Sequence, residues 1–279
     1  MSDTTKQGLQ SDPQSTVDTR GVALNQVGIS RVHYPVKVNG WERDESIQRE
    51  VDGLFDLTVS LAAANRGIHM SRLIESLHAW EAPLNPTNLQ DFLNNLRQEQ
   101  DAAFAKMSCK FNWFVSLPAP ETGRPSWQAI TTTLHATQCD EGGHSGYTLS
   151  IPVTTLCPCS RAISDYGAHS QRGWVTARIE WDDTSKVVIP EEVFEKLKHA
   201  GSAVIYPLLK RPDERHVTMD AYENPAFVED VSRKAVLALQ EDERITNFRI
   251  DARNEESIHA HDAVASFSFG KLSDAGAIG

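Results

Sequence analysis

Strand-like and helix-like hydrophobic spacings follow each other along this chain in an order that occurs twice. In the first half, apolar and polar residues alternate with the period of half-buried strands, and two helix-like stretches interrupt the alternation. The second of these stretches carries apolar residues at the i, i+3, i+4 and i+7 spacing of one helix face. The expected segments are strands at 32–38 and 55–61, helices at 71–80 and over Leu89, Phe92, Leu93 and Leu96, and strands at 111–117, 129–136 and 147–155.

The second half repeats this order. A helix at 190–200 is expected to stop at Gly201, and Asn224 with Pro225 forms an N-cap and N1 pair for a further helix. The residues expected to point inward from that helix are Phe227, Val228, Val231, Ala235 and Leu239. The remaining segments are strands at 174–181, 204–209, 248–253 and 263–269.

This recurrence predicts an α+β chain of two tandem units, each an antiparallel sheet with its helices on one face. We expect a disordered N-terminal tail at 1–20, an N-terminal unit at 21–165 and a C-terminal unit at 166–279. The halves show no residue-level identity, so duplication is a structural hypothesis.

The segment TTLCPCSRAISDYGAHSQRG at 154–173 predicts a metal site. Cys157 and His169 are ligand types that hold a divalent transition metal, and a catalytic site with three protein ligands leaves a fourth position for water. Glu214 is the clearest third ligand, because Pro212 fixes a turn after an apolar strand and aims the next side chains outward from the sheet.

The two cysteines of this segment are expected to differ in role. The single residue between Cys157 and Cys159 does not easily allow both sulfurs to reach one tetrahedral ion, so one thiol binds the metal while the other acts differently. The competing interpretation is that both are small buried hydrophobes. Pro158 favours a shaped turn, and shaped turns carry sites more often than core strands do.

Composition excludes several classes of function. A net charge of −11, from 27 basic and 38 acidic side chains, argues against a nucleic-acid surface, which needs a basic stripe. No apolar run approaches the roughly 20 residues of a membrane span, and the first twenty residues lack the apolar core of a secretory signal. We therefore expect a cytoplasmic protein whose four cysteines stay reduced and serve chemistry or metal binding.

Five segments together carry a resemblance: NRGIHMSR, the cysteine segment, YPLLKRPDE, AYENPAFVED and ESIHAHDAVA. In this order they resemble the GTP cyclohydrolase I enzymes of the type IB class, and the similarity runs from about residue 21 to 270. The resemblance implies a tunnelling fold (T-fold) with two units per chain and a homotetramer with active sites at subunit interfaces. It also implies conversion of GTP and water to formate and 7,8-dihydroneopterin triphosphate, the first step of tetrahydrofolate biosynthesis.

The same resemblance implies roles for single residues. Cys157, His169 and Glu214 match the metal ligands, and Glu229 matches the carboxylate that anchors guanine. The chemistry agrees, because one carboxylate can accept both guanine N1–H and the exocyclic amine. Without the motif, Glu229 would be interpreted as a first-turn acid favoured by the helix dipole. The ligand set suits zinc, iron or manganese.

Histidines supply the remaining candidates. His259 and His261 lie two residues apart before the last strand, so an extended backbone puts them on one side. A neutral imidazole there could shuttle protons, and we expect His259 to act in catalysis with Cys157 and Cys159. The alternative is a surface pair. His69 and Arg72 are expected to bind substrate, with Arg72 as a phosphate donor.

Two other functions account for part of these features. The nitrile reductase of queuosine synthesis is also a tunnelling-fold protein with a key cysteine, but its Glu-Ser-Lys nicotinamide signature is missing from this sequence. A thiol or metal sensor would use Cys157 and Cys159 as a redox pair. It would leave Glu214, Glu229 and the His-x-His segment unexplained.

Overall fold

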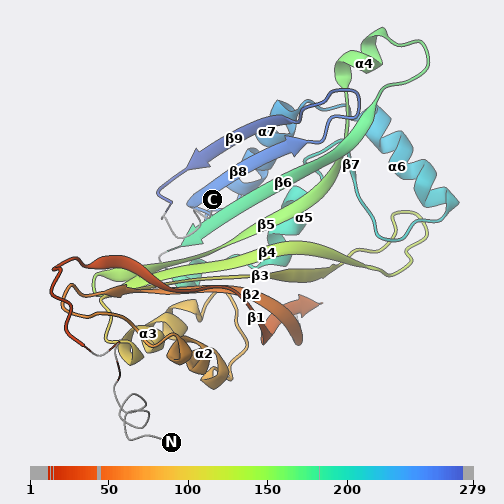
Figure 1. Cartoon of the computed structure of the whole chain (residues 1–279). Helices are drawn as coiled ribbons and strands as arrows, with labels where there is room; N and C mark the ends of the chain where they lie inside the picture. The colour runs from red at the N-terminus through yellow and green to blue at the C-terminus, as the bar shows by residue number, and fades with distance from the viewer. Residues whose placement is uncertain (1–11, 13, 15, 43–44, 182, 273–279) are drawn as a thin grey trace, which may run out of the picture.

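The strands of both halves join in one antiparallel sheet (Figure 1). The computed structural model describes residues 12, 14, 16–42, 45–181 and 183–272. Among these, nine strands pair in the order β1-β2-β3-β4-β5-β6-β8-β9, and the short β7 pairs with β5. The strands are β1 (Leu24–Glu42), β2 (Glu45–Leu61), β3 (Phe104–Ser116), β4 (Trp127–Cys139), β5 (Gly142–Leu156), β6 (Ser170–Trp181), β7 (Ala203–Val204), β8 (Asn247–Asn254) and β9 (Ala263–Phe269).

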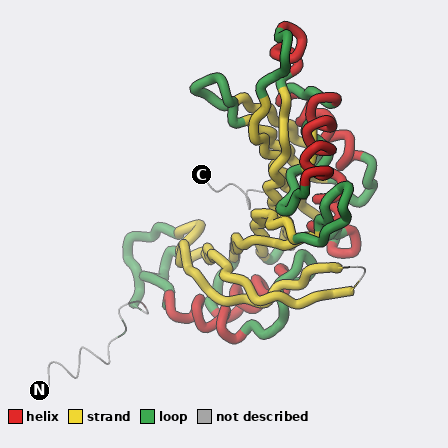
Figure 2. The backbone as a smooth tube through the Cα atoms, turned by 90° about the vertical axis from the view of Figure 1, so that its right-hand side faces the viewer, coloured by secondary structure: helices red, strands yellow, loops and turns green. Residues whose placement is uncertain are grey.

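Helices pack along the strands in each half, and Figure 2 shows them from the side. The α+β class predicted from the sequence is therefore confirmed. In the described part of the chain, no helix has the length and apolar character needed to cross a bilayer. The helices are α2 (Met70–Ala79), α3 (Leu89–Glu99), α4 (Pro158–Ile163), α5 (Pro190–Leu197), α6 (Arg211–Glu223) and α7 (Val228–Gln240), with a 3-10 turn η2 (Thr184–Lys186).

The core lies between one face of the sheet and the helices. The predicted stripe on α3 is confirmed, since its four apolar residues are buried: Leu89, Phe92, Leu93 and Leu96. Alternate residues of the central strand β5, from Tyr147 to Val153, are fully buried on the same side of the sheet. This packing fixes the central strands, whose ends carry the candidate site.

The element order repeats as two strands, then helices, then two strands. The first set ends with β4 and the second begins with β5, and the two strands pair directly from Thr131↔Ser150 to Cys139↔Gly142. The expected unit boundary at residue 165 stays a prediction.

The predicted N-terminal tail falls largely outside the described residues. Within them, Val17 forms a β-bridge with Asn65, and the Asp18 amide donates to the Ala64 carbonyl at 2.9 Å. The described end of this segment is thus held against the loop that follows β2.

Three sequence expectations in the second half were wrong. The strand expected at 204–209 is reduced to the two residues of β7, and a helix that the sequence analysis did not predict, α6, follows it. Pro212 lies in the first turn of α6, where a missing amide hydrogen costs no helical bond. The pattern gave no helix signal because the buried residues of α6 are only Asp213 and Ala221.

The third error concerns the start of α7. Asn224 closes α6 as its C-cap, and α7 begins at Val228 with Phe227 as its N-cap residue. Phe227 is 42% exposed and does not point into the core, whereas the other four residues predicted to face inward are buried: Val228, Val231, Ala235 and Leu239.

Candidate active site

Cys157 and His169 meet just beyond the paired ends of β5 and β6. The last ladder pair is Leu156↔Ser170, and the Cys157 amide then donates to the His169 carbonyl at 3.1 Å. The segment between them, which contains α4, projects past the end of the sheet in Figure 1. The sheet register therefore brings together two residues that are twelve positions apart in sequence.

The expected turn at Pro158 is a short helix, α4, which Cys157 caps. Pro158 occupies its first turn, and the Cys157 Sγ accepts a hydrogen bond from the Ser160 amide at 3.4 Å. The Ser160 hydroxyl in turn accepts from the His169 amide at 2.9 Å. Cys159 lies on the helix and is exposed. The two thiols thus have different positions, and all four cysteines of the chain are free.

The His169 ring is held by its Nδ1 atom. Nδ1 lies 2.9 Å from Gln171 Oε1, and since an amide oxygen only accepts, Nδ1 carries the proton. The Ser257 hydroxyl lies 3.4 Å from the same nitrogen. Nε2 therefore has the free lone pair that a metal ligand needs. A thiol and an imidazole in this state, on adjoining backbone, fit a divalent transition metal.

Glu214, the predicted third ligand, lies apart from this pair within one chain. It is exposed in the first turn of α6, whereas the other end of that helix reaches α4, where Arg161 stacks on the Tyr222 ring at 4.5 Å. Glu214 and Tyr222 are eight positions apart in the helix, which corresponds to about 12 Å. Among the described residues, no three His, Cys, Asp or Glu side chains form a metal-binding group. The structure brings together two of the three predicted ligands.

The start of α6 is anchored to the loop between β3 and β4. Asp213 accepts hydrogen bonds from the amides of Glu121 and Thr122 at 2.8 and 2.9 Å, and from the Lys210 amide at 2.9 Å. Burial raises the pKa of Asp213, but the hydrogen bonds outweigh burial and hold that pKa well below its usual range. This anchoring fixes Glu214 at that end of the helix.

The loop between β8 and β9 carries the predicted histidines and contacts His169 through Ser257. Ser257 belongs to this loop and makes the contact with His169 described above. The rings of His259 and His261 stack with centroids 5.2 Å apart, and both side chains are exposed. Arg253 ties the ends of the loop together, because it binds Glu255 at 3.0 Å and Asp262 at 2.9 Å.

Glu229 lies at the same end of the sheet, on the first turn of α7. The Ala226 amide donates to the Leu156 carbonyl at 3.0 Å, which ties the approach to α7 to the end of β5. The Glu229 side chain is exposed and opens onto a groove between α7 and β9 whose wall includes Leu237 and Phe267. A carboxylate beside an apolar wall is suited to a flat base with hydrogen-bond donors on its edge.

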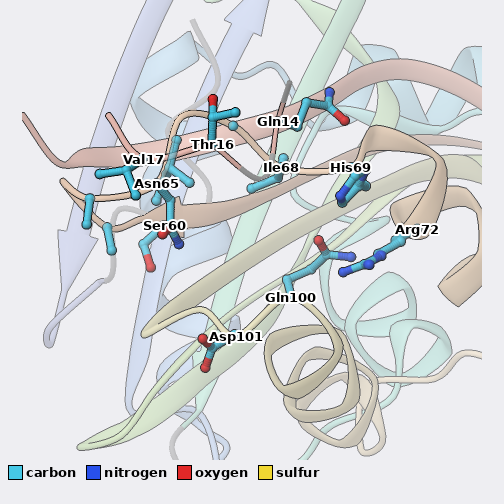
Figure 3. Close-up of a pocket in the computed structure, with 14 residues that line it drawn as sticks. Gln14, Thr16, Val17, Ser60, Asn65, Ile68, His69, Arg72, Gln100 and Asp101 are labelled. Carbon is cyan, nitrogen blue, oxygen red and sulfur yellow. The ribbon is translucent and has the colours of Figure 1, made fainter. Parts of the chain in front are cut away.

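His69 and Arg72 lie at the opposite end of the sheet. They line a pocket at the start of α2, and Figure 3 shows Gln100 pointing toward Arg72 within it. His69 Nε2 lies 3.1 Å from an Asp12 carboxylate oxygen. The pocket adjoins Leu61 at the end of β2, whereas Cys157 follows the far end of β5. With 15 residues, β5 alone spans about 50 Å. Within one chain, the cluster of His69 and Arg72 is therefore much farther from the cluster of Cys157 and His169 than the length of a nucleotide.

The residues that hold the predicted ones in place were not predicted from the sequence. Gln171 and Ser257 contact the His169 ring, and Gln100 shares the pocket of Arg72. Gln171 carried a usable signal, because it stands two positions after His169 and a strand puts such residues on one face. Ser257 carried no signal in the sequence, because the pairing of β6 with β8 is what brings it to the His169 ring.

Comparison with known proteins agrees with the resemblance noted in the sequence. A family model described as type I GTP cyclohydrolase folE2 matches residues 11–265. A GTP cyclohydrolase FolE2 from an Exiguobacterium species is 39% identical over 271 residues, which cover 95% of this chain and 88% of that protein. The GTP cyclohydrolase FolE2 of Kosmotoga olearia is 37% identical over 260 residues, which cover 93% of this chain and 98% of that protein.

Among solved structures, a hyper-thermostable AgUricase mutant superposes with a TM-score of 0.50. It shares 7% sequence identity, and the match covers 89% of this chain and 92% of that one. This likeness concerns the fold alone, and it agrees with the tunnelling-fold architecture expected from the sequence.

Proposed function

This chain belongs to the type I GTP cyclohydrolase folE2 family, and we propose that a divalent metal held by Cys157 and His169 completes its active site. The enzyme hydrolyses GTP to formate and 7,8-dihydroneopterin triphosphate, the first step of tetrahydrofolate biosynthesis. The observation that carries the proposed site is the meeting of these two residues at the ends of β5 and β6, with the His169 Nε2 lone pair free. We assign the protein to the type IB class and to the cytoplasm.

Cys157 and His169 would hold such a metal, which would supply Lewis-acid chemistry and lower the pKa of water for hydrolysis at C8 of the purine. Cys157 supplies a thiolate and His169 an imidazole nitrogen, a set that suits zinc, manganese or iron. Glu214 is the proposed third ligand. The proposal for Glu214 rests on its match to the family motif alone. Within one chain, Glu214 lies at the opposite end of α6 from Tyr222, which contacts α4.

Glu229 is proposed to bind the guanine base. Its exposed carboxylate at the groove between α7 and β9 can accept the N1–H and the exocyclic amine together, while Phe267 offers an apolar surface to the ring. Adenine lacks this pair of donors and would leave the carboxylate without partners. Specificity for guanine over adenine follows.

The exposed groups beside the metal pair are proposed to move protons. His259 stands in the loop whose Ser257 touches His169, and its stacking on His261 keeps both rings together. Opening the imidazole ring of GTP and closing the pterin ring both require protons to be delivered and removed, and the two ring nitrogens of a histidine can donate and accept them. The exposed thiol of Cys159 is the second proposed catalytic group.

We propose that His69 and Arg72 bind the triphosphate of a GTP molecule whose base and C8 are held by another chain. Two observations support an intersubunit site: the two clusters lie at opposite ends of strands about 50 Å long, and β1 and β9 each pair with one strand among the described residues. Open sheet edges pair readily with other chains, so a closed symmetric ring, such as the homotetramer that the resemblance implies, would place the two ends side by side.

Purified protein incubated with GTP and a divalent metal tests the activity. The expected result is a pterin that fluoresces after oxidation, released with an equal amount of formate. The family comparisons do not favour the nitrile reductase or the thiol sensor. The reductase would instead oxidise a nicotinamide cofactor in the presence of a nitrile, and the sensor would turn over neither substrate.

A further inference from the structure

We propose that Gln171 is a positioning residue that fixes His169 in the one tautomer able to bind a metal. This inference rests on the metal site of the proposed function, and it adds to that site a residue with no contact to metal or substrate. It follows from a chain of hydrogen bonds that runs from the buried strand β5 through Gln171 to the imidazole.

The chain begins at a rigid point. Thr155 is the second-last residue of β5, its side chain is fully buried, and its hydroxyl accepts from Gln171 Nε2 at 3.0 Å. Thr155 also pairs with Gln171 in the register between β5 and β6. Backbone and side chain therefore locate the Gln171 amide together.

The Thr155 hydroxyl can pair with either end of the amide, and in this structure it accepts from Nε2, so the oxygen end faces His169. Oε1 lies 2.9 Å from Nδ1, and that oxygen can accept only from a protonated nitrogen. The proton is thereby held on Nδ1, and the lone pair stays on Nε2. If the amide were reversed, its NH₂ group would meet Nδ1 and drive the proton to Nε2, where it would block metal binding.

Ser257 does not replace this control. Its hydroxyl lies farther from Nδ1, at 3.4 Å, and a hydroxyl can donate or accept, so it is compatible with either tautomer. Ser257 belongs to the loop between β8 and β9, which contacts the ring from outside the sheet. Among the described residues, Gln171 is the one side chain whose contact to the His169 ring permits a single proton position.

Substitutions at Gln171 separate this role from simple packing. Gln171→Met keeps the length of the side chain but removes the acceptor, whereas Gln171→Glu keeps an acceptor toward Nδ1 and loses only the donor to Thr155. Gln138→Met is the matched control, since Gln138 is an equally half-buried strand glutamine at the opposite end of the sheet. Thermal unfolding of each metal-free variant confirms that the fold is intact.

The tautomer is read directly from the ¹⁵N shifts of His169 in metal-free protein. We expect Nδ1–H in the wild type, Gln171→Glu and Gln138→Met, and a mixture in Gln171→Met. Cobalt titration should then give a dissociation constant raised about 10- to 100-fold in Gln171→Met, with Gln171→Glu and Gln138→Met within about threefold of the wild type.

Two results would overturn the inference: an Nε2–H tautomer in the wild type, or unchanged tautomer and cobalt affinity in Gln171→Met. Failure of the proposed metal site is a separate result, in which wild-type protein binds no cobalt. The tautomer measurement still decides the role of Gln171 in that case, because it is made without metal.

Discussion

At the scale of single residues, the two neighbouring cysteines are distinguished by their positions. Cys157 follows the last residue of β5 and its sulfur accepts from the Ser160 amide, whereas Cys159 is exposed on α4. The single residue between them predicted that only one could be a ligand. Cys157 is the proposed ligand, and its backbone is hydrogen-bonded to that of His169.

Replacement of each cysteine by alanine should therefore have different effects on bound metal. Cys157→Ala is expected to lose metal and activity together while it stays folded, since an open catalytic site contributes less to folding than a closed structural one. Cys159→Ala should keep its metal and lose turnover. Elemental analysis of the purified variants measures this, and full metal occupancy in Cys157→Ala would move the ligand role to Cys159.

Glu229→Gln is expected to keep the metal but lose most GTP binding. The amide offers one acceptor and sets a donor against a donor of guanine, which costs a few kcal/mol, or roughly a hundredfold in affinity. Glu241→Gln, an exposed change just after the far end of α7, serves as the control. Equal GTP affinity of the Glu229 and Glu241 variants, measured calorimetrically, would exclude Glu229 from the base pocket.

At the scale of elements, regular patterns were predictable and irregular ones were not. The stripe on α3 and the alternation in β5 show on the sequence because burial dictates both. The helix α6 carries no such stripe, and its first turn is stabilised by Asp213, which binds a loop some ninety residues earlier in sequence. That contact is invisible to local patterns. The pairing of Cys157 with His169 was predictable as a motif, whereas Gln171 needed the strand register.

The interactions of Arg244, which join the end of α7 to α5, should make the free energy of unfolding depend on pH in the acidic range. Hydrogen bonds from Arg244 lower the pKa of Asp242 to about 2, and Arg244 also binds Glu192 of α5 at 3.0 Å. The folded pKa lies below the ordinary value of 3.8, so the stabilisation is present above about pH 4 and is lost as pH falls toward 2.

Asp242→Asn tests this link. It should lower the free energy of unfolding at pH 7 by about 1 kcal/mol, since solvent screens part of the interaction. Urea unfolding at pH 7 and pH 3 should show the difference from wild type shrinking at the lower pH. A constant difference across that range would mean that the charge of Asp242 is not what stabilises the fold.

At the scale of the whole molecule, the site residues fall into two clusters at opposite ends of one sheet. Cys157, His169 and Glu229 lie at one end, and His69 and Arg72 at the other. If two chains complete one site, a mixture of Cys157→Ala and Arg72→Ala should regain activity once subunits exchange, because some interfaces carry both intact clusters. A mixture of Cys157→Ala and Glu229→Ala should regain less activity. Cys157 and Glu229 lie at the same end of one chain, so subunit exchange would rarely bring an intact Cys157 and an intact Glu229 together at one interface.

This complementation has clear opposite outcomes. Rescue in the first mixture to a fraction of wild-type activity, with weaker or no rescue in the second, supports an intersubunit site. No rescue in either mixture, after mass spectrometry of the intact assembly has confirmed exchange, would place the whole site within one chain. A monomeric mass by light scattering would have the same meaning.

Reconstitution of metal-free protein tests whether this chain hydrolyses GTP at a metal held by Cys157 and His169. Chelator-treated wild type should form neither pterin nor formate from GTP, and added zinc, manganese or iron should restore both in equal amounts. The same treatment of His169→Ala, shown to be folded, should restore neither. Full activity of the metal-free enzyme, or equal recovery in His169→Ala, would mean that this metal site does not carry out the hydrolysis.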